Sequence, residues 1–81
     1  MGAMKAKASE SSISAIERAI GYFGSQQALA MAMGVYQSYV SKLKRGDGMV
    51  PAERCRQIEE LTNGAVTRAE LRPDIFGDMA A

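Results

Sequence analysis

The 81-residue chain contains no histidine, no tryptophan, one cysteine and two prolines. The lone Cys55 cannot close a disulfide within the chain, and a zinc site of the cysteine–histidine type has no ligand set. General acid–base catalysis would fall to carboxylates, lysine or tyrosine, and no carboxylate pair stands in an obviously buried segment. The loop Gly46-Asp47-Gly48 lacks the spacing of a phosphate-binding P-loop. We therefore expect a protein that is not an enzyme, takes no cofactor and folds on an apolar core alone.

Long apolar runs are missing as well. No run approaches the roughly 20 apolar residues that cross a bilayer, and the segment after Met4 is polar, without a secretory apolar stretch. We therefore expect a cytoplasmic protein with no membrane partner. The share of apolar residues, 47%, is enough for one small domain with a single core.

The net charge of +1 hides an uneven distribution along the chain. Residues 36 to 56 carry five basic and two acidic residues, a local charge of +3, whereas residues 57 to 81 carry two basic and five acidic residues, a local charge of −3. A basic segment is typical of proteins that bind nucleic acid, but ordinary solvated charges explain the distribution equally well. The basic residues of the middle segment are Lys42, Lys44, Arg45, Arg54 and Arg56.

Apolar residues at helical spacing predict a first helix over residues 13 to 23, and Gly24 follows where a left-handed residue ends a helix. Three serines are candidates for its N-cap, namely Ser11, Ser12 and Ser14, and the last would form a capping box with Glu17. The pattern does not choose between them.

Four more short helices and no strand follow from capping residues, glycines and prolines. They cover residues 26 to 33 after the cap Ser25, residues 36 or 37 to 45, residues 51 to 61, and one last turn at 67 to 70 that ends before Pro73. We therefore predict an all-α fold of five short helices. Residues 1 to 12 would be a flexible N-terminal arm, 13 to 76 the domain, and 77 to 81 a disordered tail.

Residues 26 to 44 match the burial pattern of a helix-turn-helix. The small Ala30 lets two helix backbones approach closely, Gly34 permits a positive φ in a tight turn, and Val40 fills the angle between the helices. An ordinary two-helix corner would show only some of these matches. The six positions that match as buried are Leu29, Ala30, Met33, Val35, Val40 and Leu43.

The stretch GVYQSYVSKLKRG, residues 34 to 46, resembles the helix-turn-helix of the phage Cro and repressor proteins, and its recognition helix is similar to that of phage lambda Cro. The stretch VPAERCRQIEELTNGAVTRAELRPDIF, residues 50 to 76, is similar to the end of the YdaS family of small Cro-like prophage regulators, which are often described as antitoxins. These resemblances imply the all-helical DNA-binding domain of the phage repressors, with the helix-turn-helix at the second and third helices. Lambda Cro continues into strands that build its dimer, whereas this chain continues into a helix, so that interface does not carry over.

The start of the recognition helix carries the side chains expected to read DNA bases in the major groove. Gln37 can donate and accept together, which suits adenine, and Lys42 can donate to the two acceptors of guanine. Ser38 lies between them, and these three occupy base-reading positions in Cro-like proteins. Tyr36 and Ser41 are further candidates for base contacts. A solvated helix start is the alternative interpretation.

Other polar side chains are expected to position the protein on phosphates. Gln26 resembles the glutamine of the family that bonds a phosphate and braces the glutamine of the recognition helix, here Gln37. Lys44, Arg45 and Arg54 flank the recognition helix and the start of the next helix, where basic groups attract phosphate. A solvated charged face is the alternative for these three residues.

The function that we predict is a sequence-specific regulator of transcription, a Cro-like repressor of phage or prophage origin that binds a palindromic double-stranded DNA operator as a homodimer. The alternative is a protein-interaction module, such as an antitoxin with a toxin partner, for which DNA binding is secondary. A partner groove would favour apolar anchors on the recognition helix, and the polar Gln37, Ser38 and Ser41 argue against it.

Three expectations remain about burial. Cys55 is expected in the core because it shares the apolar face of the fourth helix. Met31 and Tyr39 fall on usually exposed positions, either as surface residues or in a partner contact. The segment from Leu71 to Phe76 either covers a dimer interface or folds back onto its own core.

Overall fold

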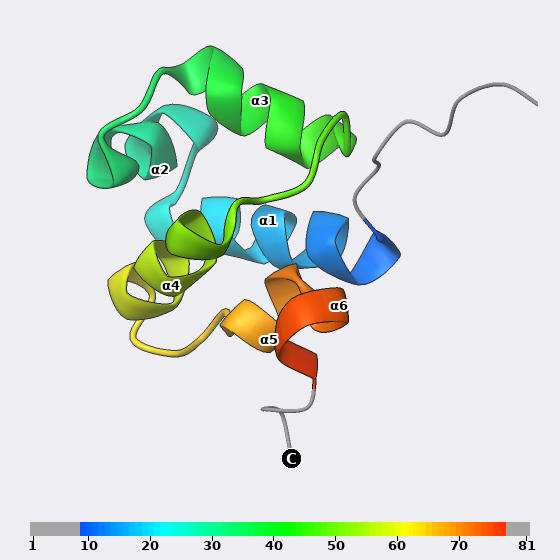
Figure 1. The fold of residues 1–81 in the computed structure, drawn as a ribbon. Helices are drawn as coiled ribbons and strands as arrows, with labels where there is room; N and C mark the ends of the chain where they lie inside the picture. Colours follow the sequence, from blue (N-terminus) through cyan, green and yellow to red (C-terminus); the bar gives the residue numbers. More distant parts are fainter. Residues whose placement is uncertain (1–8, 78–81) are drawn as a thin grey trace, which may run out of the picture.

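The computed structural model describes residues 9 to 77, and these residues form six helices and no strand (Figure 1). The helices are α1 (Glu10–Phe23), α2 (Gln26–Met33), α3 (Gln37–Arg45), α4 (Ala52–Leu61), α5 (Arg68–Leu71) and α6 (Pro73–Phe76). The predicted all-α class is confirmed, and α2 to α5 lie where the sequence places them. The predicted number of five helices is wrong, because α6 was not expected.

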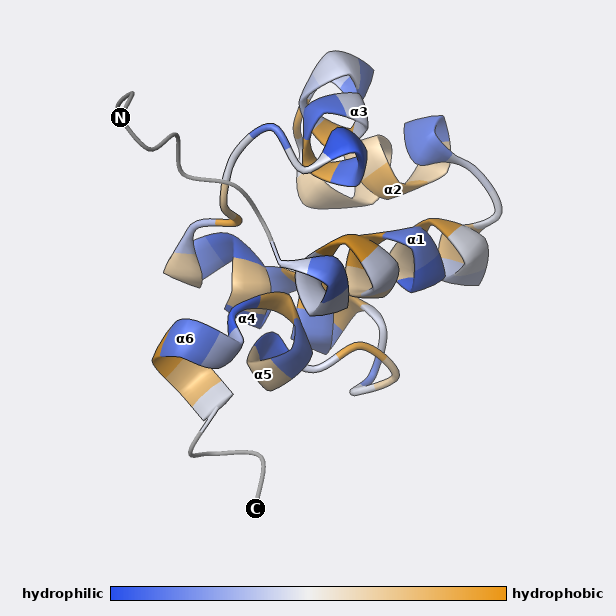
Figure 2. Cartoon of the chain, turned by 90° about the vertical axis from the view of Figure 1, so that its right-hand side faces the viewer, coloured by the Kyte–Doolittle hydropathy of each residue, from blue (hydrophilic) through white to orange (hydrophobic). Residues whose placement is uncertain are grey.

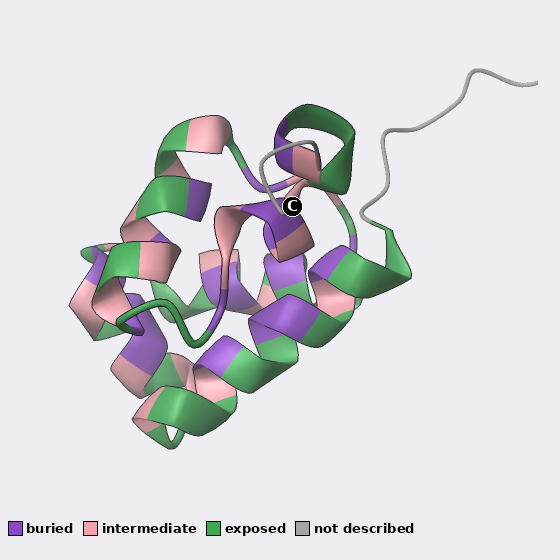
Figure 3. Cartoon of the chain, turned by 90° about the horizontal axis from the view of Figure 1, so that it is seen from below, coloured by how far each residue is buried: buried purple, intermediate pink, exposed green. Residues whose placement is uncertain are grey.

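Helix α1 passes through the middle of the molecule and contacts α2 and α3 on one side and α5 on the other (Figure 1). Helix α4 packs against α2 and α5, and α6 packs against α5. Apolar and polar residues alternate along the helices (Figure 2), as do buried and exposed ones (Figure 3), which is the pattern of amphipathic helices around one core. The core consists of Ala15, Ile16, Ala19, Leu29, Ala30, Met33, Val40, Leu43, Val50, Cys55, Ile58, Val66, Ala69, Leu71 and Phe76.

Helix α1 starts three residues earlier than predicted. Its N-cap is Ser9, whose side chain accepts a hydrogen bond from the backbone N–H of Ser12, so none of the three serines considered as caps has that role. Tertiary contacts extend the helix, because Ser12 is buried and the Ser11 hydroxyl donates to the Glu70 carbonyl at 2.9 Å. Residues 10 to 12 are therefore helical and do not belong to an arm. Of the residues expected in the arm and the tail, 1 to 8 and 78 to 81 lie outside the described residues.

Helix α6 begins at Pro73, which by sequence pattern predicts only the end of the preceding helix. Pro73 occupies the first turn of α6, where its missing N–H costs nothing. Arg72 supports this turn by donating to the Asp74 carboxylate at 2.9 and 2.8 Å and to the Val50 carbonyl at 2.9 Å. Leu71 and Phe76 are buried in the chain's own core, whereas Ile75 is 50% exposed. The segment thus folds back on its own domain through Leu71 and Phe76.

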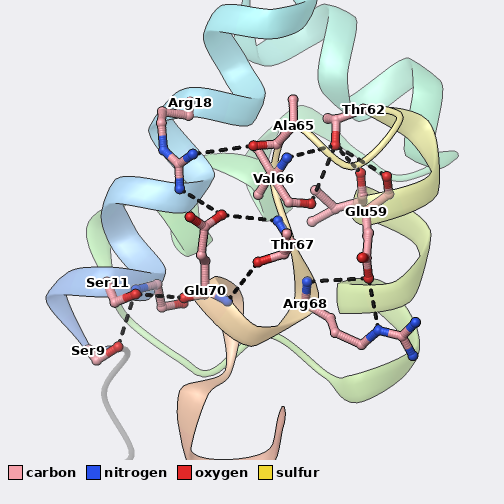
Figure 4. Close-up of polar contacts among 12 residues, drawn as sticks. Ser9, Ser11, Arg18, Glu59, Thr62, Ala65, Val66, Thr67, Arg68 and Glu70 are labelled. Atoms are coloured by element: carbon pink, nitrogen blue, oxygen red, sulfur yellow. Dashed lines mark hydrogen bonds and ion pairs between the residues drawn. The ribbon is translucent and has the colours of Figure 1, made fainter. Parts of the chain in front are cut away.

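A polar network joins the first helix to the last part of the chain (Figure 4). The turn predicted at residues 67 to 70 begins with a capping box of Thr67 and Glu70, and the Glu70 carboxylate also pairs with Arg18 at 2.9 Å. The backbone N–H of Thr67 and the Arg18 guanidinium lower the pKa of Glu70. The charged carboxylate therefore stabilises the fold at neutral pH, and this stabilisation is lost as the pH falls through the lowered pKa. The network fixes α5 against α1.

Cys55 is fully buried, as predicted, and desolvation raises the pKa of its thiol to about 11. A thiol that stays protonated at neutral pH is a weak nucleophile, so Cys55 serves as a packing residue. Of the two residues expected at the surface, Met31 is 74% exposed, whereas Tyr39 is partly buried against the core. Within residues 9 to 77, no helix has the length and apolar character of a membrane span, and no cluster of three or more metal-ligating side chains is found.

Two glycines of the described segment allow a direct test of backbone conformation. Gly34 adopts φ +76°, whereas Gly21 lies inside α1, and a Cβ added at either position would meet no atom within 4 Å. We expect Gly34→Ala to lower the free energy of unfolding by about 1 kcal/mol, because left-handed backbone is unfavourable for alanine. Gly21→Ala should raise it by about 0.5–1 kcal/mol, because alanine favours helix. Urea denaturation of both variants measures the difference. Equal changes in the free energy of unfolding for the two variants would contradict the left-handed conformation assigned to Gly34.

Candidate nucleic-acid interface

A left-handed glycine makes the turn between α2 and α3. Gly34 has φ 76° and ψ 32°, and the N–H of the next residue, Val35, bonds back to the Ala30 carbonyl at 3.0 Å. The Ala30 carbonyl also accepts from the Gly34 N–H, so two successive N–H groups of the turn bond to the last turn of α2. Ala30 is 2% exposed and Val40 is fully buried, so the two helices approach closely where the sequence predicts it. The predicted helix-turn-helix is thus present as a fold element.

The opposite face of α3 is exposed and polar. Gln37, Ser38 and Lys42 are exposed, and Ser41 is half-buried. Positions 37, 38, 41, 42 and 45 share one side of a helix, because the opposite side carries Val40 and Leu43 in the core. Helix α3 contains no acidic residue and has three basic residues in its last turn. The face therefore offers donors, acceptors and positive charge together.

Gln26 and Ser41 connect the first residue of α2 to the outer face of α3. The Ser41 hydroxyl donates to Gln26 Oε1 at 2.6 Å, so the structure gives Gln26 a different partner from the expected Gln37. Ser41 lies one turn along the helix from Gln37, nearer to the start of α2. The bond leaves the amide N–H₂ of Gln26 as a donor, which suits an anionic acceptor.

The predicted phosphate-contacting cations differ in their surroundings. Lys44 is exposed. Arg45 pairs with Asp47 at 2.9 Å, with both side chains more than half exposed, and such a surface pair contributes little to stability. Arg54 is half-buried and donates through Nη1 to the Met33 carbonyl at 3.3 Å and to Gln57 Oε1 at 2.7 Å. Arg54 is thus held by the fold, whereas Lys44 is solvated.

A groove of about 750 Å³ lies between the starts of α3 and α4. Its lining is mostly apolar, with one charged side chain, and comprises Gly34, Val35, Tyr36, Tyr39, Pro51 and Arg54. Tyr36 is 84% exposed. Tyr36 and Pro51 are the N-caps of α3 and α4, and neither provides a side-chain hydrogen bond to its helix. The first backbone N–H groups of both helices therefore lack the side-chain caps that Ser9, Ser25 and Thr67 give to α1, α2 and α5.

The family described as "Bacterial toxin YdaS" matches residues 16–80 of this sequence. The chain belongs to the YdaS family. A relative from Escherichia coli (strain K12), "Putative transcriptional regulator YdaS", is 42% identical over 59 residues, which are 73% of this chain and 60% of the relative. The chain thus spans 60% of the length of that relative.

A solved structure is similar to this chain in both fold and sequence. The "Cro protein from putative prophage element Xfaso 1 in Xylella fastidiosa strain Ann-1" is 57% identical, with a TM-score of 0.71, over 78% of this chain and 95% of that chain. The predicted resemblance to Cro-like helix-turn-helix regulators and to the YdaS family is confirmed. In this YdaS-family domain, the helix-turn-helix is formed by α2 and α3.

One polar residue of this region, Gln57, is not among the predicted site residues. Its amide Nε2 donates to the Met33 carbonyl at 3.0 Å, beside Arg54, which lies one helical turn earlier on α4. The spacing of three residues is the only sequence signal, since side chains three apart lie on one helix face. Its partner, a backbone carbonyl of another helix, has no sequence signature.

Two serines on α3 of the YdaS-family domain form a matched pair for measuring the bond between Ser41 and Gln26. Ser41→Ala should lower the free energy of unfolding by about 1 kcal/mol more than Ser38→Ala, because only Ser41 donates a hydrogen bond within the described structure. The gain in helix propensity from alanine is common to both variants and cancels in the comparison. Urea denaturation monitored by circular dichroism gives both values. A difference near zero would show that the bond does not stabilise the fold.

Proposed function

We propose that this YdaS-family domain binds double-stranded DNA in a sequence-specific manner and regulates transcription as a Cro-like repressor of phage or prophage origin. The observation that carries the proposal is the division of α3 into two faces. Val40 and Leu43 anchor one face in the core, and Gln37, Ser38 and Lys42 stand exposed on the other. An α-helix presented in this way fits the major groove of B-DNA.

The exposed side chains suit base edges. Gln37 can bond adenine through one donor and one acceptor, and Lys42 can donate to guanine. Ser38 suits either base. The Ser41 hydrogen is already given to Gln26, so Ser41 would face a base only as an acceptor, for example for an exocyclic amine. Tyr36, 84% exposed at the start of α3, would contact a thymine methyl or a phosphate.

Phosphate contacts would fix the orientation of the domain on the duplex. Four side chains at or beside the helix-turn-helix offer donors for phosphate. They are the amide of Gln26, the solvated ammonium of Lys44 and the guanidinium groups of Arg45 and Arg54. A single domain of this size makes few contacts. We therefore propose that two copies bind a palindromic operator, with half-sites one helical turn of about 34 Å apart. Repression would follow from excluding the polymerase.

A protein-interaction role is the second candidate. The family description refers to a bacterial toxin, and two residues with large apolar side chains, Met31 and Tyr36, are 74% and 84% exposed. A toxin or another regulator could dock on such residues. The polar face of α3 favours DNA, since a helix that enters a protein groove presents apolar anchors at regular spacing.

Selection from a random duplex library, at two salt concentrations, tests the proposed function. We expect enrichment of a palindrome that persists at the higher salt concentration, where phosphate-only binding weakens steeply. No enrichment with folded protein would remove the DNA-binding proposal and favour the protein partner. Sedimentation of the protein with and without the enriched duplex then shows whether the dimer exists only on DNA.

Substitutions of two lysines on α3 distinguish base contacts from phosphate contacts. Lys42→Ala should weaken binding by about 1–3 kcal/mol and relax the preference at one base position. Lys44→Ala should weaken binding to every sequence by a similar factor and reduce the salt dependence. Fluorescence anisotropy with the enriched duplex and its single-base variants measures both effects. Equal, sequence-independent losses from the two variants would show that Lys42 does not read a base.

A further inference from the structure

We propose that Gln57 is a positioning residue for DNA binding that acts through Arg54. In this role Gln57 holds the Arg54 guanidinium in the groove beside α3, ready to contact a backbone phosphate of the operator. The proposal rests on the proposed function, because it concerns the same protein–DNA interface.

Three groups form a closed set of hydrogen bonds between α4 and the end of α2: the Gln57 amide, the Arg54 guanidinium and the Met33 carbonyl. Gln57 Nε2 donates to the Met33 carbonyl at 3.0 Å, and Arg54 Nη1 donates to that carbonyl at 3.3 Å and to Gln57 Oε1 at 2.7 Å. Met33 is the last residue of α2, so its carbonyl has no acceptor role within that helix. Both ends of the Gln57 amide are used, which fixes its orientation.

These bonds leave part of the Arg54 guanidinium available. A guanidinium has five N–H donors in one plane, and the two of Nη1 are the ones bonded to Met33 and Gln57. The donors on Nε and Nη2 have no partner in the described part of the chain. Because the group is planar, holding Nη1 also fixes the direction of these remaining donors. Arg54 therefore reaches the groove with little rotational freedom left to lose on binding.

The groove suits the sugar–phosphate backbone of a duplex. Arg54 is the one charged residue in its lining, and Tyr36, Tyr39 and Pro51 give apolar surface against which a sugar can pack. The uncapped first N–H groups of α3, which has no acidic residue in its first turn, add partial positive charge at the same place. The base-reading residue Gln37 directly follows Tyr36, so a strand whose bases face α3 would pass its backbone along this groove.

A double-mutant cycle tests the coupling. We would measure anisotropy titrations of the full chain, as wild type, Gln57→Met, Arg54→Met and the double variant, at four salt concentrations. The probes are the duplex enriched in the selection and a shuffled duplex of equal composition. Gln57→Met should weaken binding to both duplexes by the same factor. It should also make the negative slope of log K against log salt shallower by about 0.9, the value for one phosphate contact. The double variant should bind no more weakly than Arg54→Met alone.

Arg56→Met provides the matched control. Arg56 is exposed on the same helix, and its guanidinium carbon Cζ lies 6.0 Å from the centroid of the Phe76 ring. Arg56 does not line the groove. Loss of the Arg56 guanidinium should leave the slope of log K against log salt unchanged. An unchanged slope for Gln57→Met, or independent losses in the double variant, would overturn the positioning role while leaving DNA binding intact. A wild-type protein that binds neither duplex would overturn the proposed function and the positioning role together.

A measurement on the wild type covers the case in which Gln57→Met does not fold. Nitrogen-15 relaxation of the arginine side-chain Nε groups, in the protein without DNA, reports their picosecond to nanosecond motion. We expect Arg54 Nε to be rigid and Arg56 Nε to be mobile, because only Arg54 is held by Gln57 and Met33. Equal mobility of the two groups would contradict a guanidinium that is positioned before binding.

Discussion

The close approach of α2 and α3 is the contact on which the candidate interface depends. It requires a small side chain at Ala30, a left-handed residue at Gly34 and a buried wedge at Val40. Once Val40 is fixed in the core, the rotation of α3 about its own axis is fixed as well. The polar side chains on its other face therefore point outward. Core packing thus sets which residues of α3 are available to a partner.

The rest of the fold supports this pair of helices from two sides. Helix α1 contacts both α2 and α3, and its own position is fixed by the bonds that Ser11 and Arg18 make to Glu70. Helix α4 reaches the end of α2 through Arg54 and Gln57, whose bonds satisfy the Met33 carbonyl. A buried carbonyl without a partner would be costly, so these bonds also favour one arrangement of α4 against the turn. The same contacts place the groove beside the start of α3.

The charge segregation along the sequence becomes a segregation in space. The basic residues of α3 lie on one side of the molecule, and α5 and α6 lie on the other (Figure 1). Several carboxylates of the acidic end are engaged in ion pairs with nearby arginines, as in Glu59 with Arg68 and Asp74 with Arg72. Their negative charge is therefore partly compensated away from α3. An anionic ligand that approaches α3 meets mainly positive charge.

The sequence alone determined the helix-turn-helix and most helix ends, because these depend on local features: helical spacing of apolar residues, Gly34 and Gly46 after α2 and α3, and the capping box at Thr67. It also identified the polar residues of α3 through their spacing relative to Val40 and Leu43. Tertiary structure alone decided the early start of α1, the turn of α6, the choice of Ser41 as the partner of Gln26, and the bonds of Gln57. Each of these depends on contacts between segments distant in sequence, many of them with backbone carbonyls. A carbonyl is the same group at every residue, so no sequence pattern marks which one a side chain will reach.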